Sequence, residues 1–321
     1  MDILIQSLIL LGGLVLILLG ANYLVDGSSS IAKKFGISEF VIGLTIVGIG
    51  TSAPEMVVSF MSAFQDKTDM AIGNIVGSNI FNTLMILGVT SLIAPLTITK
   101  ANHKKDIPLN IIVTALLVIL GMNATLFGTG TDQLSRLDGV ILLGIFAWYL
   151  WKSFKSDNGD SREEGEGIKT YKTLTSVILI IAGLAGLVIG GRLFVNSATL
   201  LAKMFGVSDK FIAITIMAAG TSMPELATCV VAALKGRGQL ALGNVLGSNI
   251  SNILLILGGA AVISPLSFGS MTYVDLGVVL VAAVLIFLSA YCFKKKELDR
   301  IEASIFIILE ICYMWYLIAH L

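Results

Sequence analysis

Two glutamates, Glu55 and Glu225, interrupt stretches of sequence that are otherwise apolar. They end the segments GTSAPE (50–55) and GTSMPE (220–225), and the first lies between FVIGLTIVGI and MVVSFMSAF. An unpaired charge at the centre of a membrane-spanning helix costs about 2.5–3.5 kcal/mol on insertion scales. The apolar stretches around both glutamates, and those that follow them, carry no Lys or Arg in their interiors. Each carboxyl group must therefore be protonated or matched by a cation that is not part of the chain.

A proline precedes each of these glutamates. Pro54 and Pro224 have no N–H group, so the carbonyl groups of Gly50 and Gly220 lose their helical partners. An unpaired carbonyl at membrane depth is tolerated where it is buried in protein, lines a water-filled cavity or meets a cation. A packing kink is the structural alternative, but the adjacent carboxylates favour a cation site.

Hydroxyl and amide side chains accompany both glutamates at regular spacing. Within the two segments they are Thr51, Ser52, Thr221 and Ser222, and in the next apolar stretches they recur at steps of four, as Asn74, Ser78 and Asn82 and again as Asn244, Ser248 and Asn252. Carboxylate, amide, hydroxyl and carbonyl oxygens without His or Cys favour hard cations such as Ca²⁺ and Na⁺. Calcium takes about 6–8 oxygen ligands, and two bidentate glutamates with two freed carbonyls already supply about six. The pattern predicts a shared cation site with a charge of −2.

The two motifs belong to an internal repeat with an offset of 170 residues. AKKFGIS (32–38) returns as AKMFGVS (202–208), and IGNIVGSNIFN (72–82) returns as LGNVLGSNISN (242–252). Each half holds five apolar spans, and an odd number makes the second half enter the membrane from the opposite side. Inverted repeats of this kind are typical of secondary transporters, whose substrate sites lie near the midplane where the halves meet.

The composition is that of an integral membrane protein. The 321 residues are 56% hydrophobic and 13% charged, whereas about 25% is usual in soluble domains. Runs of spanning length predict an all-α polytopic membrane protein with ten transmembrane helices. The predicted spans are 3–25, 39–64, 70–94, 107–127, 137–154, 173–194, 209–234, 240–264, 273–293 and 301–319.

These spans divide the chain into a first five-helix repeat (1–154), a linker (155–172) and a second five-helix repeat (173–321). The termini and the loops on their side of the membrane hold only five of the 21 basic residues, which are Lys67, Arg136, Arg192, Lys203 and Lys210. Because cytoplasmic loops carry the excess of Lys and Arg, we expect a cytoplasmic linker and extracytoplasmic termini.

Exchange of Na⁺ for Ca²⁺ is one of four functions that this site could serve. A proton/calcium exchanger could use the same two glutamates, although the hydroxyl-rich positions argue for sodium. A cation channel would need an open pore. An enzyme is disfavoured, because the sequence has no Ser/Lys dyad, paired catalytic Asp motif or H-E-x-x-H. We expect no cofactor, nucleic acid or obligate protein partner. The expected partners are Ca²⁺, Na⁺ or H⁺ and the lipid bilayer.

The paired motifs GTSAPE…GNIVGSNIFN and GTSMPE…GNVLGSNISN resemble the repeats of the sodium/calcium exchangers, within the calcium:cation antiporter superfamily. The short linker leaves no room for the large regulatory domains of animal members, so the chain is similar to the compact prokaryotic ones. The resemblance implies exchange of Na⁺ for Ca²⁺ across the cytoplasmic membrane by alternating access, in the direction of Ca²⁺ extrusion. It also implies that the first span of each half slides to switch access.

The resemblance further implies a division of labour among the polar residues. Glu55 and Glu225 would hold calcium, helped by the carbonyls of Thr51 and Thr221. Asn82 and Asn252 would line the centre, and since some relatives have Asp where this chain has Asn252, potassium co-transport is disfavoured. The implied sodium ligands are Ser52, Ser78, Ser222, Ser248 and carbonyls near Gly48 and Ala218.

Overall fold

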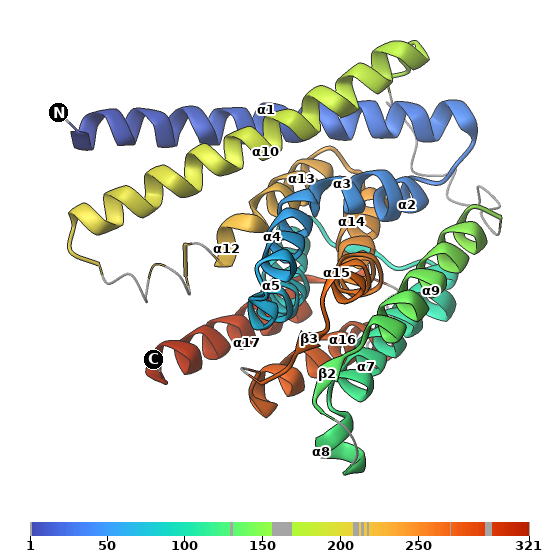
Figure 1. Cartoon of the computed structure of the whole chain (residues 1–321). Helices are drawn as coiled ribbons and strands as arrows, with labels where there is room; N and C mark the ends of the chain where they lie inside the picture. The colour runs from blue at the N-terminus through green and yellow to red at the C-terminus, as the bar shows by residue number, and fades with distance from the viewer. Residues whose placement is uncertain are drawn as a thin grey trace.

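The protein is almost entirely helical in a computed structural model (Figure 1). The structure describes residues 2–128, 131–155, 169–207, 212, 215–216, 218–269, 271–292 and 297–320. The start of the predicted span 209–234 and most of the predicted linker 155–172 lie outside these residues. The described strands are four two-residue segments in antiparallel pairs, β1 (Leu96–Thr97) with β4 (Glu297–Leu298) and β2 (Gln133–Leu134) with β3 (Leu266–Ser267).

The helices of the first half form five apolar segments, several of them interrupted by π-helical turns, which are labelled η. They are α1 (Asp2–Phe35); α2 (Glu39–Ile42), η1 (Gly43–Val47), α3 (Gly48–Thr51) and α4 (Ala53–Phe64); α5 (Thr68–Phe81), η2 (Asn82–Ile86) and α6 (Leu87–Ile93); η3 (Asn102–Asp106), α7 (Ile107–Gly121) and α8 (Asn123–Phe127); and α9 (Arg136–Lys155).

The second half repeats this order. Its described helices are α10 (Thr173–Met204); α12 (Ala218–Thr221) and α13 (Met223–Leu234); α14 (Gly238–Ser251), η6 (Asn252–Leu257) and α15 (Gly258–Ile263); α16 (Tyr273–Cys292); and α17 (Arg300–Ala319). Among the described residues, six helices are long and apolar enough to cross a membrane, and the bent pair Glu39–Thr51 and Ala53–Phe64 adds a seventh. Two shorter apolar helices of the described residues are Met223–Leu234, which is α13, and Tyr273–Ser289, within α16. The prediction of an all-helical polytopic membrane protein is confirmed.

The first helix of each half is longer than predicted. The predicted spans ended at residues 25 and 194, whereas α1 has 34 residues and α10 has 32. The prediction followed the apolar run alone. The α1 helix continues through the polar turn that contains Lys33 and Lys34 and ends before Gly36, which has a left-handed φ of 66°. At 1.5 Å per residue α1 is about 50 Å long, against about 30 Å of hydrocarbon, so it is long enough to cross the membrane at a tilt or to extend beyond it at its polar end.

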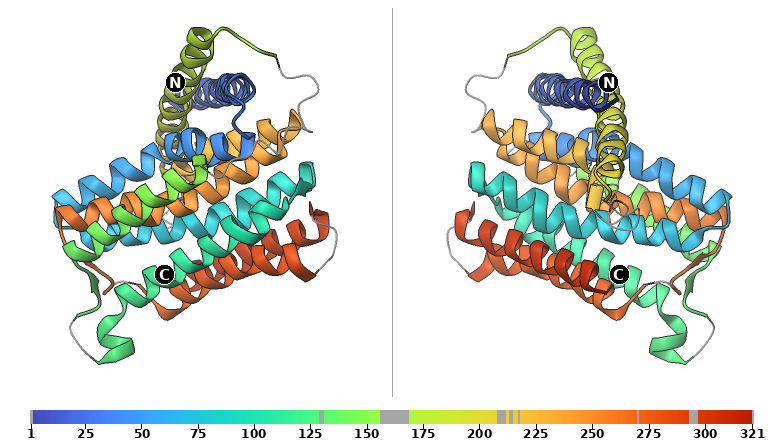
Figure 2. Two further views of the ribbon diagram at one scale, coloured as in Figure 1. Left: turned by 90° about the vertical axis from the view of Figure 1, so that its right-hand side faces the viewer. Right: turned by 90° about the vertical axis from the view of Figure 1, so that its left-hand side faces the viewer.

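The two long helices lie against each other across one face of the other helices, as two directions of view show (Figures 1 and 2). Glycines bring their backbones into contact. A Cβ added to Gly13 of α1 would lie 2.8 Å from the amide nitrogen of Phe194, and one added to Gly20 would lie 2.8 Å from the carbonyl oxygen of Gly183. Close approach through small residues is the usual way in which helices associate in lipid.

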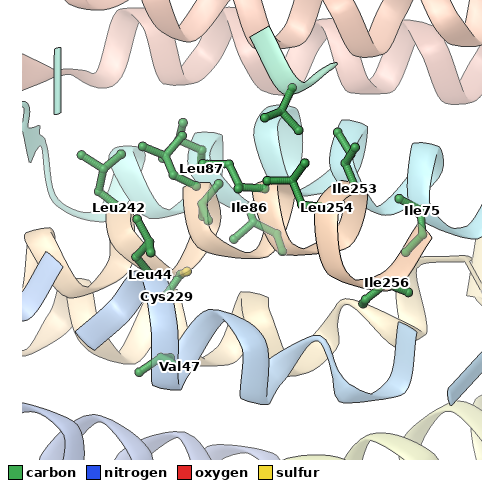
Figure 3. Close-up of a cluster of buried hydrophobic side chains, with 14 of the residues drawn as sticks. Leu44, Val47, Ile75, Ile86, Leu87, Cys229, Leu242, Ile253, Leu254 and Ile256 are labelled. Carbon is green, nitrogen blue, oxygen red and sulfur yellow. The ribbon is translucent and has the colours of Figure 1, made fainter. Parts of the chain in front are cut away.

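The four segments that carry the polar motifs share one apolar core. Figure 3 shows its side chains, including Leu44 and Val47 of η1, Ile86 of η2 and Ile253 of η6, each no more than 2% exposed. Glycine again allows close packing, since a Cβ on Gly247 of α14 would collide with the backbone of Leu44.

Replacement of Gly13 by Ala should destabilise the protein, because the new methyl group would push α1 away from α10. Overpacking of this kind costs about 1–3 kcal/mol. Gly12 is the matched control, since it is exposed and its added Cβ would meet no described atom within 4 Å. Thermal unfolding of the purified protein in detergent should show a lower midpoint for Gly13→Ala than for Gly12→Ala. Equal midpoints would mean that the glycine contact does not hold the two helices together.

Candidate cation site

The predicted helix break occurs in both motifs, two residues before the proline. Ser52 separates α3 from α4, and the two parts meet at a bend of 49°. Ser222 separates α12 from α13 with a similar conformation, φ −90° and ψ 8°. Pro54 and Pro224 then lie in the first turn of the new helix, where a missing N–H group does no harm. The broken helix therefore starts again just before each glutamate.

The break places both carboxylates at the positive end of a helix. Glu55 and Glu225 lie in the first turns of α4 and α13, and each is only 1% exposed. The unsatisfied N–H groups of a first turn favour negative charge, typically by 0.3–1 kcal/mol at exposed sites and by up to about 2 kcal/mol when partly buried. Each half-helix thus lowers the cost of the charge that its own sequence places in the membrane.

Each glutamate is held by the serine of the opposite repeat. The Ser52 hydroxyl donates to Oε1 of Glu225 at 2.9 Å, and the Ser222 hydroxyl donates to Oε1 of Glu55 at 3.1 Å. These reciprocal hydrogen bonds bring the two carboxylates into one site, as the sequence predicted. The site is therefore assembled from both halves of the chain and belongs to neither alone.

The second oxygen of each carboxylate is free. Oε2 of Glu55 and Oε2 of Glu225 are buried and have no hydrogen-bond partner among the described residues. Within the same part of the chain, neither glutamate forms an ion pair. The basic residues that join α13 to α14 pair elsewhere, Lys235 with Asp26 and Arg237 with Glu39. A buried carboxylate oxygen without a partner is costly, and a bound cation would satisfy it.

Two asparagines also have a buried side-chain oxygen without a described hydrogen-bond partner. Oδ1 of Asn82 and Oδ1 of Asn252 are buried and lack a partner among the described residues. Each residue begins a π-helical turn, η2 or η6, a feature that is frequent at functional sites. Ser78, one helical turn before Asn82 on the same face, donates to Oε1 of Glu55 at 3.4 Å. The free amide oxygen of Asn82 therefore belongs to the helix face that meets Glu55.

The other two predicted amides are already engaged. Asn74 donates to the Ser59 hydroxyl at 3.1 Å, and Asn244 donates to the Cys229 sulfur at 3.2 Å. The oxygen of Asn244 accepts a hydrogen bond from the Thr51 hydroxyl at 3.1 Å. Through the hydrogen bond that its oxygen accepts, Asn244 holds the Thr51 hydroxyl in place, and the second lone pair of that oxygen is left for another partner.

The remaining predicted residues show how the two halves differ. Ser248 donates to the carbonyl oxygen of Gly48 at 3.2 Å across the repeats, whereas its counterpart Ser78 contacts Glu55. A Cβ on Gly48 would lie 3.0 Å from the amide nitrogen of Ser248, so the two backbones touch there. On the other side Ala218 and Thr221 are the first and last residues of α12, immediately before the break.

Three polar residues at the centre were missed by the sequence analysis. They are Asn79, Asn249 and Thr83, each 2–3% exposed, and they form hydrogen bonds between the segment α5–η2 and the helix α14. Asn79 and Asn249 lie inside the repeated blocks, which was the available signal. They were passed over because they follow Ser78 and Ser248 directly and so fall off the stripe of residues spaced by four.

Glu310 is a buried acid outside the two glutamate motifs. Glu310 of α17 is 2% exposed, and its Oε2 has no partner among the described residues. No described hydrogen bond links it to either glutamate motif. It provides a matched control for the two site glutamates.

Comparison with known proteins places this geometry in a family. The family described as "Sodium/calcium exchanger protein" matches residues 5–155 and 175–319, which is one match in each half. The chain belongs to the sodium/calcium exchanger family. It is therefore a member of a family of cation antiporters and not an enzyme, and the family resemblance of the two motifs is confirmed.

Individual members of the family cover nearly the whole chain. The sodium/calcium exchanger MaX1 of Methanosarcina acetivorans is 34% identical, over 97% of each chain. The inner membrane protein YrbG of Escherichia coli is 34% identical, over 91% of this chain and 90% of its own. The solved structure of the sodium-calcium exchanger NCX_Mj soaked with zero Na⁺ and Ca²⁺ has a TM-score of 0.84 and 31% identity, and covers 98% of this chain and 99% of its own.

Replacement of Glu55 or Glu225 by Gln should abolish stabilisation by Ca²⁺ while the protein stays folded. A ligand at 100 times its dissociation constant adds about 2.7 kcal/mol to the free energy of unfolding, and a neutral amide removes the charge that attracts it. The thermal midpoint in detergent should rise with Ca²⁺ for the unsubstituted protein and for Glu310→Gln. A midpoint that still rises in Glu55→Gln or Glu225→Gln would exclude that carboxylate as a calcium ligand.

Proposed function

We propose that this protein exchanges Na⁺ for Ca²⁺ across the membrane by alternating access. The observation that carries the proposal is the pair of carboxylates, Glu55 and Glu225, whose Oε2 atoms are buried without a partner among the described residues. Each half of the chain contributes one carboxylate, and each is held by a serine of the other half. A site of this composition suits a divalent cation with oxygen ligands.

The charge of the site gives a reason for obligatory exchange. Two carboxylates without a basic partner are expensive to seal away from water on both sides. One Ca²⁺ neutralises the charge of −2, and Na⁺ ions can do the same in its place. Only the loaded forms should then change easily between outward and inward access, so one ion crosses only in exchange for the other.

The proposed ligands follow the residue types and contacts. Calcium would be held by Glu55 and Glu225 with the carbonyls of Thr51 and Thr221, and the amide oxygens of Asn82 and Asn252 would line the centre. The side-chain oxygens of the two glutamates and the two asparagines that lack a partner among the described residues support this assignment. The proposed sodium ligands are Ser52, Ser78, Ser222, Ser248 and the carbonyls near Gly48 and Ala218. The direct contact of Ser248 with the Gly48 carbonyl, at 3.2 Å, puts two such oxygens within reach of one ion.

We infer that residues 1–154 and 173–321 are the two functional repeats, joined by a cytoplasmic linker at 155–172. The distribution of Lys and Arg supports this orientation in the cytoplasmic membrane, and the relative YrbG is named as an inner membrane protein. If three Na⁺ exchange for one Ca²⁺, each cycle moves one net charge. The membrane potential would then favour calcium extrusion by about 2.3 kcal/mol per 100 mV.

The test is calcium uptake into proteoliposomes that hold the purified protein. An outward Na⁺ gradient should drive uptake of radioactive Ca²⁺, and collapse of that gradient with a sodium ionophore should stop it. The rate should fall to background in Glu55→Gln and in Glu225→Gln, but not in Glu310→Gln. Uptake that follows a pH gradient and ignores Na⁺ would replace the proposal with proton/calcium exchange. Unitary currents in planar bilayers would replace it with a channel.

A further inference from the structure

A network of four asparagines joins the third and eighth segments beside the carboxylates. Asn82 donates through Nδ2 to Oδ1 of Asn249 at 3.2 Å, and Asn252 donates through Nδ2 to Oδ1 of Asn79 at 3.0 Å. The two hydrogen bonds are equivalent under the repeat, because Asn252 corresponds to Asn82 and Asn249 corresponds to Asn79 at the offset of 170 residues. All four side chains are at most 3% exposed, so water does not compete for these groups.

These two hydrogen bonds decide which end of each ligand amide faces the site. A primary amide carries its oxygen and its nitrogen on opposite sides of one planar group. When Nδ2 of Asn82 or Asn252 is bonded to the opposite repeat, Oδ1 must turn the other way. Both Oδ1 atoms are indeed buried and without a partner in the described part of the chain. A flipped amide would instead present N–H groups, which repel a cation.

The partner asparagines are themselves held in place. Asn79 donates to the backbone carbonyl of Asn249 at 3.1 Å, and Asn249 donates to the Thr83 hydroxyl at 2.8 Å. The difference between these anchors follows from the sequence, since the position equivalent to Thr83 is Ile253, which has no hydroxyl group. Asn79 therefore relies on a backbone acceptor. Because Nδ2 is turned toward these acceptors, Asn79 and Asn249 present Oδ1 to the ligand amides.

We infer that Asn79 and Asn249 are positioning residues that fix the amides of Asn252 and Asn82 with their oxygens toward the cation. They do not touch the ion themselves, and each acts on the ligand of the other repeat. The inference rests on the proposed function, because it assumes that Asn82 and Asn252 face a bound cation.

The test is a double-mutant cycle on the dissociation constant for Ca²⁺. Asn79→Ala is made in the natural chain and in an Asn252→Asp background, and binding of radioactive Ca²⁺ is measured at equilibrium in detergent. An aspartate carries oxygen on both sides of its carboxylate, so it needs no partner to aim it. Loss of an orienting partner typically weakens metal binding about 10–100-fold. We expect at least a tenfold weaker affinity for Asn79→Ala beside Asn252, and a change within about twofold beside Asp.

A purely structural role for Asn79 predicts a different result. Loss of a contact between helices would weaken binding equally in both backgrounds, and that outcome would overturn the inference, as would unchanged affinity in the natural chain. Asn102→Ala is the matched control, because Asn102 is equally buried but accepts hydrogen bonds from Thr99 at a loop. Its replacement should lower the thermal midpoint and leave the affinity for Ca²⁺ unchanged.

An independent variant covers the case in which Asn79→Ala does not fold. Thr83→Val keeps the shape of the side chain but removes the hydroxyl that holds Asn249. It should weaken Ca²⁺ binding beside Asn82 and have no effect in an Asn82→Asp background; equal effects would refute the Asn249 half of the inference. Because no ion gradient is used, absence of sodium-driven uptake by the natural protein would disprove the proposed exchange without deciding this test.

Discussion

The structure depends on two carboxylates that the chain itself does not neutralise. Glu55 and Glu225 are buried at the restart of two broken helices, and the described residues offer them hydroxyl groups and helix N-termini but no basic side chain. These polar contacts orient the charges and reduce their cost, but they do not cancel them. The site therefore favours the uptake of a positive ion, a metal cation or a proton, which suits a member of a family of cation antiporters.

Reciprocal hydrogen bonds between the two repeats hold the residues of the site together. Serines cross to the opposite glutamate, and the amides of Asn82 and Asn252 cross to the opposite asparagine. An ion bound at the centre would pull on oxygens from both halves at once. A movement of one half relative to the other must then change several ligands together, so that ion binding and the rearrangement of the halves are coupled through the same hydrogen bonds.

The sequence predicted the features that rest on local chemistry. Proline without an N–H group, glutamate without a basic neighbour and a repeat with an offset of 170 are visible in the letters alone, and they led to the helix breaks and the paired acids. The extent of α1 and α10 was underestimated, because the apolar runs end at residues 25 and 194 although the helices continue to Phe35 and Met204. The π-helical turns and the roles of Asn79 and Asn249 depend on contacts between segments 170 residues apart, which spacing along one helix does not encode.

Equivalent positions of the two repeats differ in residue type and in hydrogen-bond partner. Cys229 replaces the equivalent Ser59 as the acceptor for an asparagine, and Ile253 replaces the equivalent Thr83. Ser248 bonds to the Gly48 carbonyl, whereas Ser78 bonds to a glutamate. Two perfectly equivalent halves would surround the ion identically. Because Ser78 and Ser248 have different hydrogen-bond partners, an ion that bound beside one of them would compete with a different protein group from an ion that bound beside the other.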